Sequence, residues 1–490
     1  MNSLELEKLE KQLEKQIYKE SYYEFFKVAF CQLHPDDEYD ENWHAEYLCG
    51  ELQKEAERIW RKQDRDKDII INMPFRAAKS MITTVIFPVW CWSQNPRTKF
   101  ICVSYSGDLA LEHAQMSRNL INGVWFQRLY GSKFGWDAHD NAKGFYKNTE
   151  GGFRKSVGTG GQITGSGGDI IIVDDPQNPK KAASEVEREN AKSFYDHTLY
   201  SRLNQPSVGV RIIVMQRLHE EDVSGHLMDE KTGRPDEHKH ICIPAEYDEE
   251  ILSPPGLKDK YIDNLFWPTR FSFKELKSYK RVLGELQAAG QLQQRPAPAE
   301  GNLVKRAWIE IVNPEEVVRN ASSEPIYFYL DTAYTEKQEN DPSGILCCFK
   351  SESQKCVYVL NIAEVFKIFP ELVKFVREYL RINGYTTSSM IKVEPKASGK
   401  SLVQQLKLTD GLNIVEIDSE MVSDDKITRL SAVSPLIQAG KWKLVRGAWN
   451  DYYLSQICTF PNTKHDEFVD LTAYAIDDLL MKEDLWWSFL

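Results

Sequence analysis

The sequence contains no hydrophobic run long enough to cross a bilayer. The longest apolar stretches, such as Met81 to Trp92, are interrupted by threonines and a proline and stay short of a membrane span. The N-terminus is charged and helix-prone, which is unlike a secretory signal. We therefore expect a protein of the cytoplasm that has no membrane partner.

Cysteine pairs with zinc-site spacing are missing as well. The chain has 9 cysteines, an odd number, and several of them lie in apolar, strand-like runs. Free, buried thiols fit this pattern better than disulfides or zinc. Excess basic charge is also absent, since the net charge is −12. This disfavours nonspecific attraction to nucleic acid, although a local basic channel can still follow a DNA backbone.

Length and composition indicate a soluble globular protein with two large domains. The chain of 490 residues is longer than one hydrophobic core usually supports. Its hydrophobic content of 42% and charged content of 27% are ordinary for globular proteins.

The most informative stretch is a glycine-dense loop, residues 158–169, that leads into four apolar residues and the pair Asp174 and Asp175. Four apolar residues in a row are typical of a central parallel strand that is covered on both faces. Carboxylates at the end of such a strand lie where open α/β sheets bind their ligands. The pattern predicts a metal site, and an acidic turn at the strand exit is the alternative.

A second candidate motif lies near residue 80. A β-prone run, residues 68–73, is followed by a short loop that ends in Lys79 and Ser80, and then by an apolar, helix-like run. A phosphate-binding loop uses such a lysine for the terminal phosphates and such a hydroxyl for Mg²⁺. Ala77 and Ala78 stand where glycine would help the backbone to curl.

Further strands alternate with helices, which predicts a mainly parallel sheet. In this setting Asp174 is the expected magnesium ligand, and Asp175 is placed to orient an attacking water. Gln216 follows another apolar strand, residues 210–215, where a polar side chain would sense the γ-phosphate.

The second half predicts a metal-dependent nuclease. Three strands at short spacing, near residues 326–330, 343–349 and 355–360, suggest an antiparallel meander, and residues 369–382 suggest a helix. Asp331 and Glu394 each follow an expected strand, and Asp466 and Asp470 lie one turn apart on an expected C-terminal helix. Two strand acids followed by a helix acid are what an RNase H-like fold uses to hold two divalent ions. Oxygen-only ligands suit Mg²⁺ or Mn²⁺.

The order of these motifs resembles the large terminase subunit of tailed bacteriophages. The resemblance includes the segment around Trp43, the Pro-x-Arg-x-x-Lys-Ser loop at Pro74 to Ser80, the glycine-rich loop, Val-Asp-Asp-Pro and Arg-x-His-x-x-Asp, and it covers most of the chain. It implies a viral DNA-packaging motor, an ATPase of the additional-strand P-loop type joined to an RNase H-like endonuclease.

The resemblance also implies individual roles. Arg76 is expected to contact the γ-phosphate of ATP, and adenine is expected near Trp43. Asp331, Glu394 and a helix acid, with Asp466 favoured over Asp470, match the nuclease positions. Lys426 and Arg429 match a segment near the family's active site and are expected to contact DNA phosphates, with solvated surface charges as the alternative.

The fold class expected from the residues and the resemblance together is α/β. We expect an N-terminal helical region over 1–60, a P-loop ATPase domain over 61–300, a linker over 301–325 and an RNase H-like domain over 326–490. The partners that the resemblance implies are double-stranded DNA, the portal protein and the small terminase subunit. It also implies a monomer in solution that forms a ring at the prohead vertex in the host cytoplasm.

Two other functions remain open at this point. The first is a stand-alone metal-dependent nuclease whose N-terminal half is a nucleotide switch. The second is a non-catalytic factor that docks on capsid or DNA, a function for which Ala77 and Ala78 would be evidence of a dead ATPase.

Overall fold

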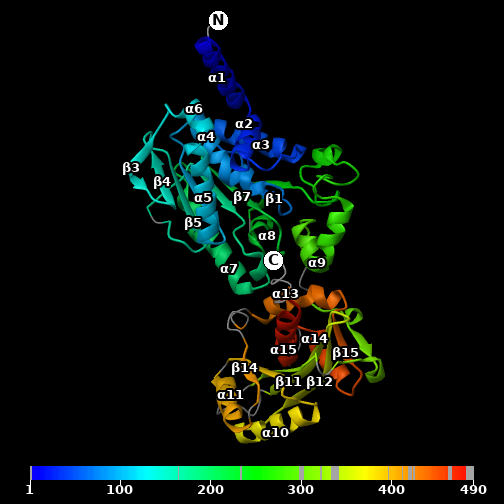
Figure 1. Ribbon diagram of the computed structural model, residues 1–490. Helices are drawn as coiled ribbons and strands as arrows, with labels where there is room; N and C mark the ends of the chain where they lie inside the picture. Colours follow the sequence, from blue (N-terminus) through cyan, green and yellow to red (C-terminus); the bar gives the residue numbers. More distant parts are fainter. Residues whose placement is uncertain are drawn as a thin grey trace. The chain divides into compact units, whose positions relative to one another are not determined.

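The computed structural model divides into two units, residues 1–280 with 286–297 and residues 281–285 with 298–490 (Figure 1). The parts of the chain that it describes are residues 3–163, 165–231, 234–296, 303–320, 323–332, 342–395, 397–410, 412–417, 422, 425–461 and 466–481. No helix within these ranges is both long enough and apolar enough to cross a membrane. All nine cysteines are free and eight of them are buried, as predicted.

The first unit contains an eight-stranded sheet in the order β3-β4-β5-β2-β6-β7-β1-β8. Neighbouring strands are parallel throughout the part of the sheet that runs β5-β2-β6-β7-β1-β8, and only β3-β4 and β4-β5 are antiparallel. The predicted mainly parallel sheet is therefore confirmed. The strands are β1 (Asp68–Asn72), β2 (Phe100–Ser104), β3 (Trp136–Asn141), β4 (Phe145–Asn148), β5 (Phe153–Gly158), β6 (Ile170–Asp174), β7 (Val210–Met215) and β8 (His238–Cys242).

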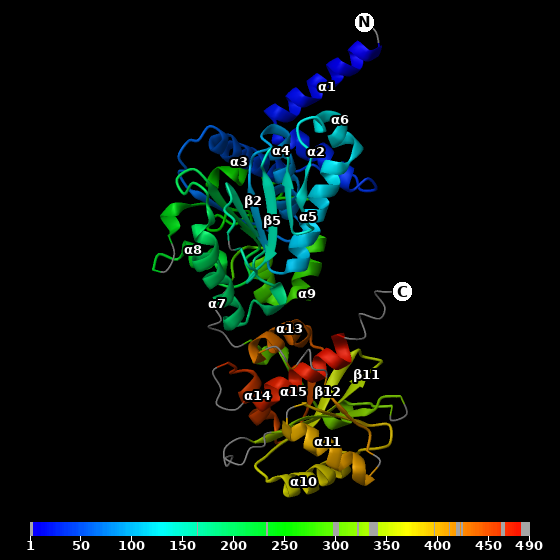
Figure 2. The same ribbon diagram turned by 90° about the vertical axis from the view of Figure 1, so that its left-hand side faces the viewer.

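The central strands β1, β2, β6 and β7 are buried along their whole length, because helices cover both faces of the sheet. One face packs on apolar residues of α7, the π-helical turn η3 and α8, and α5 lies along β2 and β5 on the sheet (Figure 2). The helices are α1 (Ser3–Glu20), α2 (Tyr22–Leu33), α3 (Trp43–Trp60), η1 (Met81–Ile86), α4 (Phe87–Gln94), α5 (Gly107–Asn122), α6 (Val124–Tyr130), η2 (Pro179–Lys181), α7 (Glu185–Ser193), η3 (Phe194–Leu199), η4 (Tyr200–Arg202), α8 (Val223–Met228), η5 (Pro235–Glu237), η6 (Pro255–Lys260) and α9 (Phe273–Gln291).

The strand order places β7 between β1, which leads into the candidate phosphate loop, and β6, which ends in the paired acids. An extra strand at this position is the arrangement expected of an additional-strand P-loop ATPase domain. Because β1, β7 and β6 are parallel, the residues that follow them come together at one edge of the sheet.

The second unit contains a seven-stranded sheet in the order β14-β13-β10-β11-β12-β15-β9. The predicted meander is confirmed, since β10, β11 and β12 are antiparallel neighbours, whereas β13, β14, β15 and β9 join through parallel pairs. The strands are β9 (Glu310–Val312), β10 (Ile326–Asp331), β11 (Ser343–Ser351), β12 (Cys356–Val365), β13 (Met390–Val393), β14 (Ile414–Glu416) and β15 (Trp442–Val445).

Two helical layers enclose this sheet. One core joins it to α10 and α11 and another joins it to α13, α14 and α15, which lie on opposite faces (Figure 2). The predicted helix over 369–382 is confirmed as α10. Residues 301–325, predicted as a linker, include β9, which pairs with β15 at the edge of the sheet. The helices are η7 (Arg306–Trp308), η8 (Pro314–Glu316), α10 (Phe369–Ile382), α11 (Ala397–Asp410), α13 (Lys426–Gln438), α14 (Asn450–Ile457), α15 (Glu467–Ile476) and η9 (Asp477–Met481).

Candidate active sites

The segment between β1 and η1 curls as a phosphate loop does, although it contains no glycine. Arg76 and Ala78 have φ values of 55° and 58°, in the left-handed region that glycine usually supplies. Holding non-glycine residues there costs on the order of 1 kcal/mol each. The imidazole of His44 donates from Nε2 to the carbonyl oxygen of Ala77 at 3.1 Å, which fixes the middle of the loop. The loop therefore curls without any glycine.

Lys79, Ser80, Asp174 and Asp175 lie together at the end of this loop. The hydroxyl of Ser80 donates to Asp174 Oδ1 at 3.0 Å, and Lys79 Nζ lies 3.1 Å from Asp175 Oδ2. Lys79 is buried and Asp174 is inaccessible to solvent. Four residues predicted from two separate motifs are thus neighbours in space.

The positive charge near the carboxyl groups of Asp174 and Asp175 does not compensate for their burial. Burial raises the pKa of both Asp174 and Asp175, and Lys79 opposes the effect without cancelling it. His113 Nδ1 lies 3.6 Å from Asp174 Oδ2, but burial lowers the pKa of His113 to about 4, so this imidazole is neutral near pH 7. Asp174 Oδ2 is buried and accepts no hydrogen bond. A hydroxyl and carboxylates with such an unsatisfied oxygen fit Mg²⁺.

Gln216 joins the same site through the backbone. Its N–H donates to Asp175 Oδ1 at 3.3 Å, and its side-chain Oε1 is buried without a hydrogen bond. The segment after Gln216 is held by Asp222, which accepts from Arg217 Nε at 3.0 Å and from the backbone N–H of Leu218 at 2.9 Å. The backbone at the end of β7 is therefore held beside the carboxylate predicted to orient water.

Trp43 and Arg76 have no contact with the four residues of this cluster that the structure shows. Trp43 Nε1 donates to the carbonyl oxygen of Phe266 at 2.9 Å, and its ring centroid lies 5.8 Å from that of Tyr261. The neighbouring His44 connects this aromatic group to the phosphate loop. Arg76 is exposed and makes no ion pair within the described part of the chain.

In the second unit, Asp331 and Glu394 lie at the same edge of the sheet. β10 and β13 are parallel neighbours with Leu330 opposite Val393, and the N–H of Glu394 donates to the carbonyl oxygen of Leu330 at 3.0 Å. Both acids are buried. The parallel pairing explains why two acids 63 positions apart in the sequence converge.

The helix acids are held by two basic residues of α13. Lys426 Nζ lies 2.6 Å from Asp466 Oδ1 and 3.2 Å from Asp470 Oδ2, and Arg429 lies 2.5 Å from Asp470 Oδ1. Burial raises the pKa of Asp470, the two bases oppose this, and Glu394 adds to it. Asp470 is fully buried, and the nearby charge of Glu394 acts on it. Asp466, the acid favoured from the sequence, occupies the N-cap position of α15 without a side-chain capping bond and is about one-third exposed.

The Tyr474 hydroxyl connects α15 to the strand acids, because it donates to Glu394 Oε1 at 2.9 Å. Within the ranges that the structure describes, no three acidic, histidine or cysteine side chains are arranged so as to hold a metal ion. The carboxylate donors themselves suit Mg²⁺ or Mn²⁺. The ammonium of Lys426 would have to move for a divalent cation to reach both helix acids.

Gly399 is a further residue on which the nuclease site depends, and the sequence did not reveal it. A Cβ at this position in α11 would lie 2.0 Å from the carbonyl oxygen of Glu394, so only glycine lets the helix pass so close to the acid. A glycine five residues after a strand-end acid, inside a helical segment, was the available signal. His44 and Tyr474 were also not assigned roles, and their contacts join residues that are distant in the sequence.

The two sheets define a P-loop ATPase-like domain and an RNase H-like α/β domain. Residues 328–479 match the family described as the Terminase RNaseH-like domain. Residues 328–479, which make up most of the second unit, are therefore similar to a terminase RNaseH-like domain, in agreement over this part of the chain with the resemblance seen in the sequence. No curated protein matches the chain.

Several solved structures are similar to the chain at low identity. The large terminase of a thermophilic bacteriophage, in complex with ADP, is 12% identical, with 88% of this chain and 99% of that chain covered and a TM-score of 0.49. The HK97 bacteriophage large terminase is 10% identical, with 84% and 87% covered and a TM-score of 0.35. The nuclease domain of the bacteriophage SPP1 large terminase with bound Mn is 17% identical, with 36% and 98% covered and a TM-score of 0.27.

Proposed function

We propose that this chain is the large subunit of a viral DNA-packaging motor. It hydrolyses ATP to translocate double-stranded DNA into a prohead and cuts concatemeric DNA with a metal-dependent endonuclease. The observation that carries the proposal is the presence, in one chain, of the Lys79–Asp175 and Ser80–Asp174 site and a terminase RNaseH-like domain.

In the ATPase site, Lys79 binds the terminal phosphates of ATP, and Arg76 reaches the γ-phosphate from the exposed part of the loop. Mg²⁺, which Ser80 and Asp174 would hold, would neutralise charge on the phosphates. Asp175 accepts a hydrogen bond from the attacking water and orients it. Gln216, hydrogen-bonded to Asp175 through its backbone, senses the γ-phosphate at the end of β7, and Trp43 lies near the adenine.

In the nuclease site, Asp331, Glu394 and Asp470 would hold the metal ions, together with the more exposed Asp466. Mg²⁺ or Mn²⁺ bound there supplies stabilisation of the attacking and leaving oxygens of the phosphodiester. Lys426 and Arg429, which pair with Asp466 and Asp470 here, would be available to contact DNA phosphates if those carboxylates held metal. The Tyr474 hydroxyl keeps Glu394 oriented.

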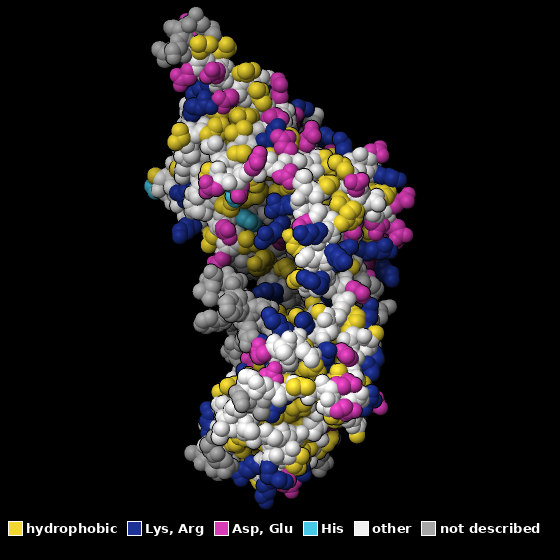
Figure 3. Space-filling model, turned by 45° about the vertical axis from the view of Figure 1, so that its right-hand side comes forward, with side chains coloured by type: hydrophobic (Ala, Val, Ile, Leu, Met, Phe, Trp, Pro, Cys, Tyr) yellow, Lys and Arg dark blue, Asp and Glu magenta, His cyan; other side chains and the backbone are white. Residues whose placement is uncertain are grey.

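The partners of this function are double-stranded DNA, the portal protein and the small terminase subunit. The subunit acts as a ring on the portal at the prohead vertex in the host cytoplasm. A net charge of −12 disfavours nonspecific DNA binding, but lysine and arginine side chains gather locally on the face in Figure 3. Local basic surface of this kind is enough for contacts to a phosphate backbone.

The test compares plasmid cleavage with Mg²⁺ or Mn²⁺ and ATP hydrolysis in the wild type, Asp331→Ala and Lys79→Ala. We expect Asp331→Ala to lose cleavage alone and Lys79→Ala to lose hydrolysis alone. Lys443→Ala, which removes an ion pair to Glu310 elsewhere in the second unit, is the matched control and keeps both activities. Cleavage that survives Asp331→Ala would refute the nuclease assignment.

Two measurements separate this proposal from the other functions. A stand-alone nuclease with a nucleotide switch would show no stimulation of ATP hydrolysis by portal or empty capsids. A docking factor would fail to hydrolyse ATP even in the full assembly. The left-handed φ values of Arg76 and Ala78 favour an active loop, because an unused loop has no reason to retain the strain.

A further inference from the structure

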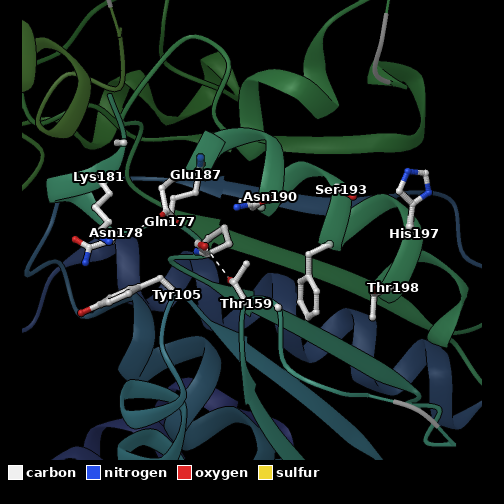
Figure 4. Close-up of a pocket in the computed structure, with 15 residues that line it drawn as sticks. Tyr105, Thr159, Gln177, Asn178, Lys181, Glu187, Asn190, Ser193, His197 and Thr198 are labelled. Atoms are coloured by element: carbon white, nitrogen blue, oxygen red, sulfur yellow. Dashed lines mark hydrogen bonds and ion pairs between the residues drawn. The ribbon is translucent and has the colours of Figure 1, made fainter. Parts of the chain in front are cut away.

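A cavity of about 450 Å³ lies in the first unit beside the chain that follows Asp175 (Figure 4). Its volume is within the range of about 300–1,000 Å³ that is usual for small-molecule sites. We call it the Gln177 pocket. Its lining residues include Tyr105, Thr159, Gln177, Asn190, Phe194 and His197.

The Gln177 pocket is separate from the phosphate loop. Its walls come from the segments that follow β2, β5 and β6 and from α7 and η3. In the sheet, β2 lies on the side of β6 that faces away from β7 and β1. None of Lys79, Ser80 and Asp174 is among its lining residues. A ligand in this pocket would therefore not compete with the phosphates of ATP.

Gln177 is the strongest sign that the pocket takes a ligand. Its side chain is only 5% exposed, and its Oε1 accepts from the N–H of Val223 at 3.0 Å. Its Nε2 is buried and has no hydrogen-bond partner. An unsatisfied buried donor costs about 1–3 kcal/mol. Since this nitrogen has almost no accessible surface, the acceptor atom of a ligand would reach it only after the Gln177 amide turns toward the cavity.

The other lining groups define the chemistry of that ligand. Tyr105, Asn178 and Lys181 lie at one end of the pocket, His197 and Thr198 lie at the other, and Gln177 and Asn190 lie between them (Figure 4). Lys181 Nζ is 3.6 Å from Glu187 Oε1, so the charges at that end balance. The pocket thus offers side-chain amides, hydroxyls and aromatic rings rather than net charge.

We propose that the Gln177 pocket binds a nucleobase. A base is planar, presents hydrogen-bond donors and acceptors along its edges, and stacks on aromatic side chains. Glutamine and asparagine amides pair with two edge atoms of a base at once. A free nucleotide and an unstacked base of a single DNA strand share this chemistry.

The pocket is also connected to the proposed hydrolytic site, and this step rests on the proposed function. The N–H of Tyr105 donates to the carbonyl oxygen of Asp175 at 3.0 Å, and Thr159 Oγ1 donates to that of Pro176 at 2.9 Å. Asp175 has a φ of 44°, so the backbone that these contacts hold is strained. A bound base therefore stabilises one position of Asp175 and changes the rate of ATP hydrolysis.

The test uses the full chain and two fluorescent probes, 2-aminopurine riboside and a short single-stranded oligonucleotide with one central 2-aminopurine. Stacking in the pocket quenches the probe, so titration gives the affinity. Asn190→Ala removes an exposed lining amide and Ser193→Trp fills the pocket, whereas Val186→Ala changes an exposed position of α7 that does not line it. We expect at least about tenfold weaker binding in the first two variants, corresponding to about 1.4 kcal/mol, and no weakening in the control.

Quenching of the riboside identifies a free nucleotide as the occupant, and quenching of the oligonucleotide alone identifies a DNA strand. Binding that is unchanged by Ser193→Trp, or no binding of either probe, would overturn the proposal. Trp43→Ala must retain probe binding, since loss there would assign the base to the proposed adenine site beside Trp43. If the probe binds but the protein does not hydrolyse ATP, the nucleobase site is supported and the motor function is refuted.

Discussion

The ammonium of Lys426 lies 2.6 Å from Asp466 Oδ1, on the side of α15 where a divalent cation is expected. Asp470 Oδ2 is 3.2 Å from the same nitrogen. Burial tends to lower the pKa of Lys426, but the two aspartates outweigh it and the pKa is raised. A permanent positive charge thus holds the helix acids together.

Replacement of Lys426 by alanine should therefore raise the affinity of the nuclease domain for Mn²⁺. Because Asp470 keeps its contact to Arg429, the loss of one ammonium does not leave it without a cation. We expect a gain on the order of tenfold, or about 1.4 kcal/mol, by isothermal titration calorimetry without DNA. Lys443→Ala is the control, and an unchanged Mn²⁺ affinity in a folded Lys426→Ala protein would contradict the prediction.

Gly399→Ala should impair cleavage while ATP hydrolysis stays at the wild-type rate. The added Cβ would lie 2.0 Å from the carbonyl oxygen of Glu394, so the strand end that carries this acid has to shift. A displaced metal ligand lowers cleavage at least about tenfold. Plasmid cleavage and circular dichroism measure the effect and the integrity of the fold. Gly50→Ala, where the Cβ meets no atom within 4 Å, should change neither activity.

Acid should destabilise the first unit through His44. Burial lowers the pKa of His44 from 6.5 to about 4, although the Ala77 carbonyl and Asp40 oppose this shift. The unfolded chain takes up the proton first as pH falls, so stability is lost between about pH 6.5 and pH 4. From about pH 7.5 to about pH 5 this residue accounts for roughly 2 kcal/mol of the loss.

Urea unfolding of the wild type and His44→Gln at these two pH values checks the prediction. Glutamine can still donate to the Ala77 carbonyl but does not titrate. The pH dependence of the variant should be shallower than that of the wild type by the stated amount. Equal slopes for both proteins would show that His44 is not the titrating group.

Asp68→Ala should destabilise the first unit strongly. Arg211 donates from Nη1 to Asp68 Oδ2 at 2.7 Å and from its backbone N–H to Oδ1 at 2.8 Å, and both residues are almost fully buried. Removal of one partner leaves a buried charge without compensation and costs about 3–5 kcal/mol. Thermal unfolding measures the loss. Glu57→Ala breaks an exposed pair to Arg61 and should cost less than about 0.5 kcal/mol.

The buried strands were predictable because their local pattern is unambiguous. The run Ile170 to Val173 predicted a central parallel strand, and β6 lies between β2 and β7. The meander of the second unit followed from short apolar strands at close spacing. β9 was missed because it is only three residues long and lies in the segment predicted as a linker, and its pairing with β15 is what makes it a strand.

The sequence by itself determined which residue types follow each strand: Lys79 and Ser80 after β1, Asp174 and Asp175 at β6, and Asp331 and Glu394 at β10 and β13. Parallel pairing then brings strand ends to one edge, so their proximity was inferable. Only the tertiary structure decided that Lys426 forms ion pairs with Asp466 and Asp470. The same holds for the position of Gln177 in the wall of a cavity. These relationships depend on the packing of helices against one another, a property that no local periodicity encodes.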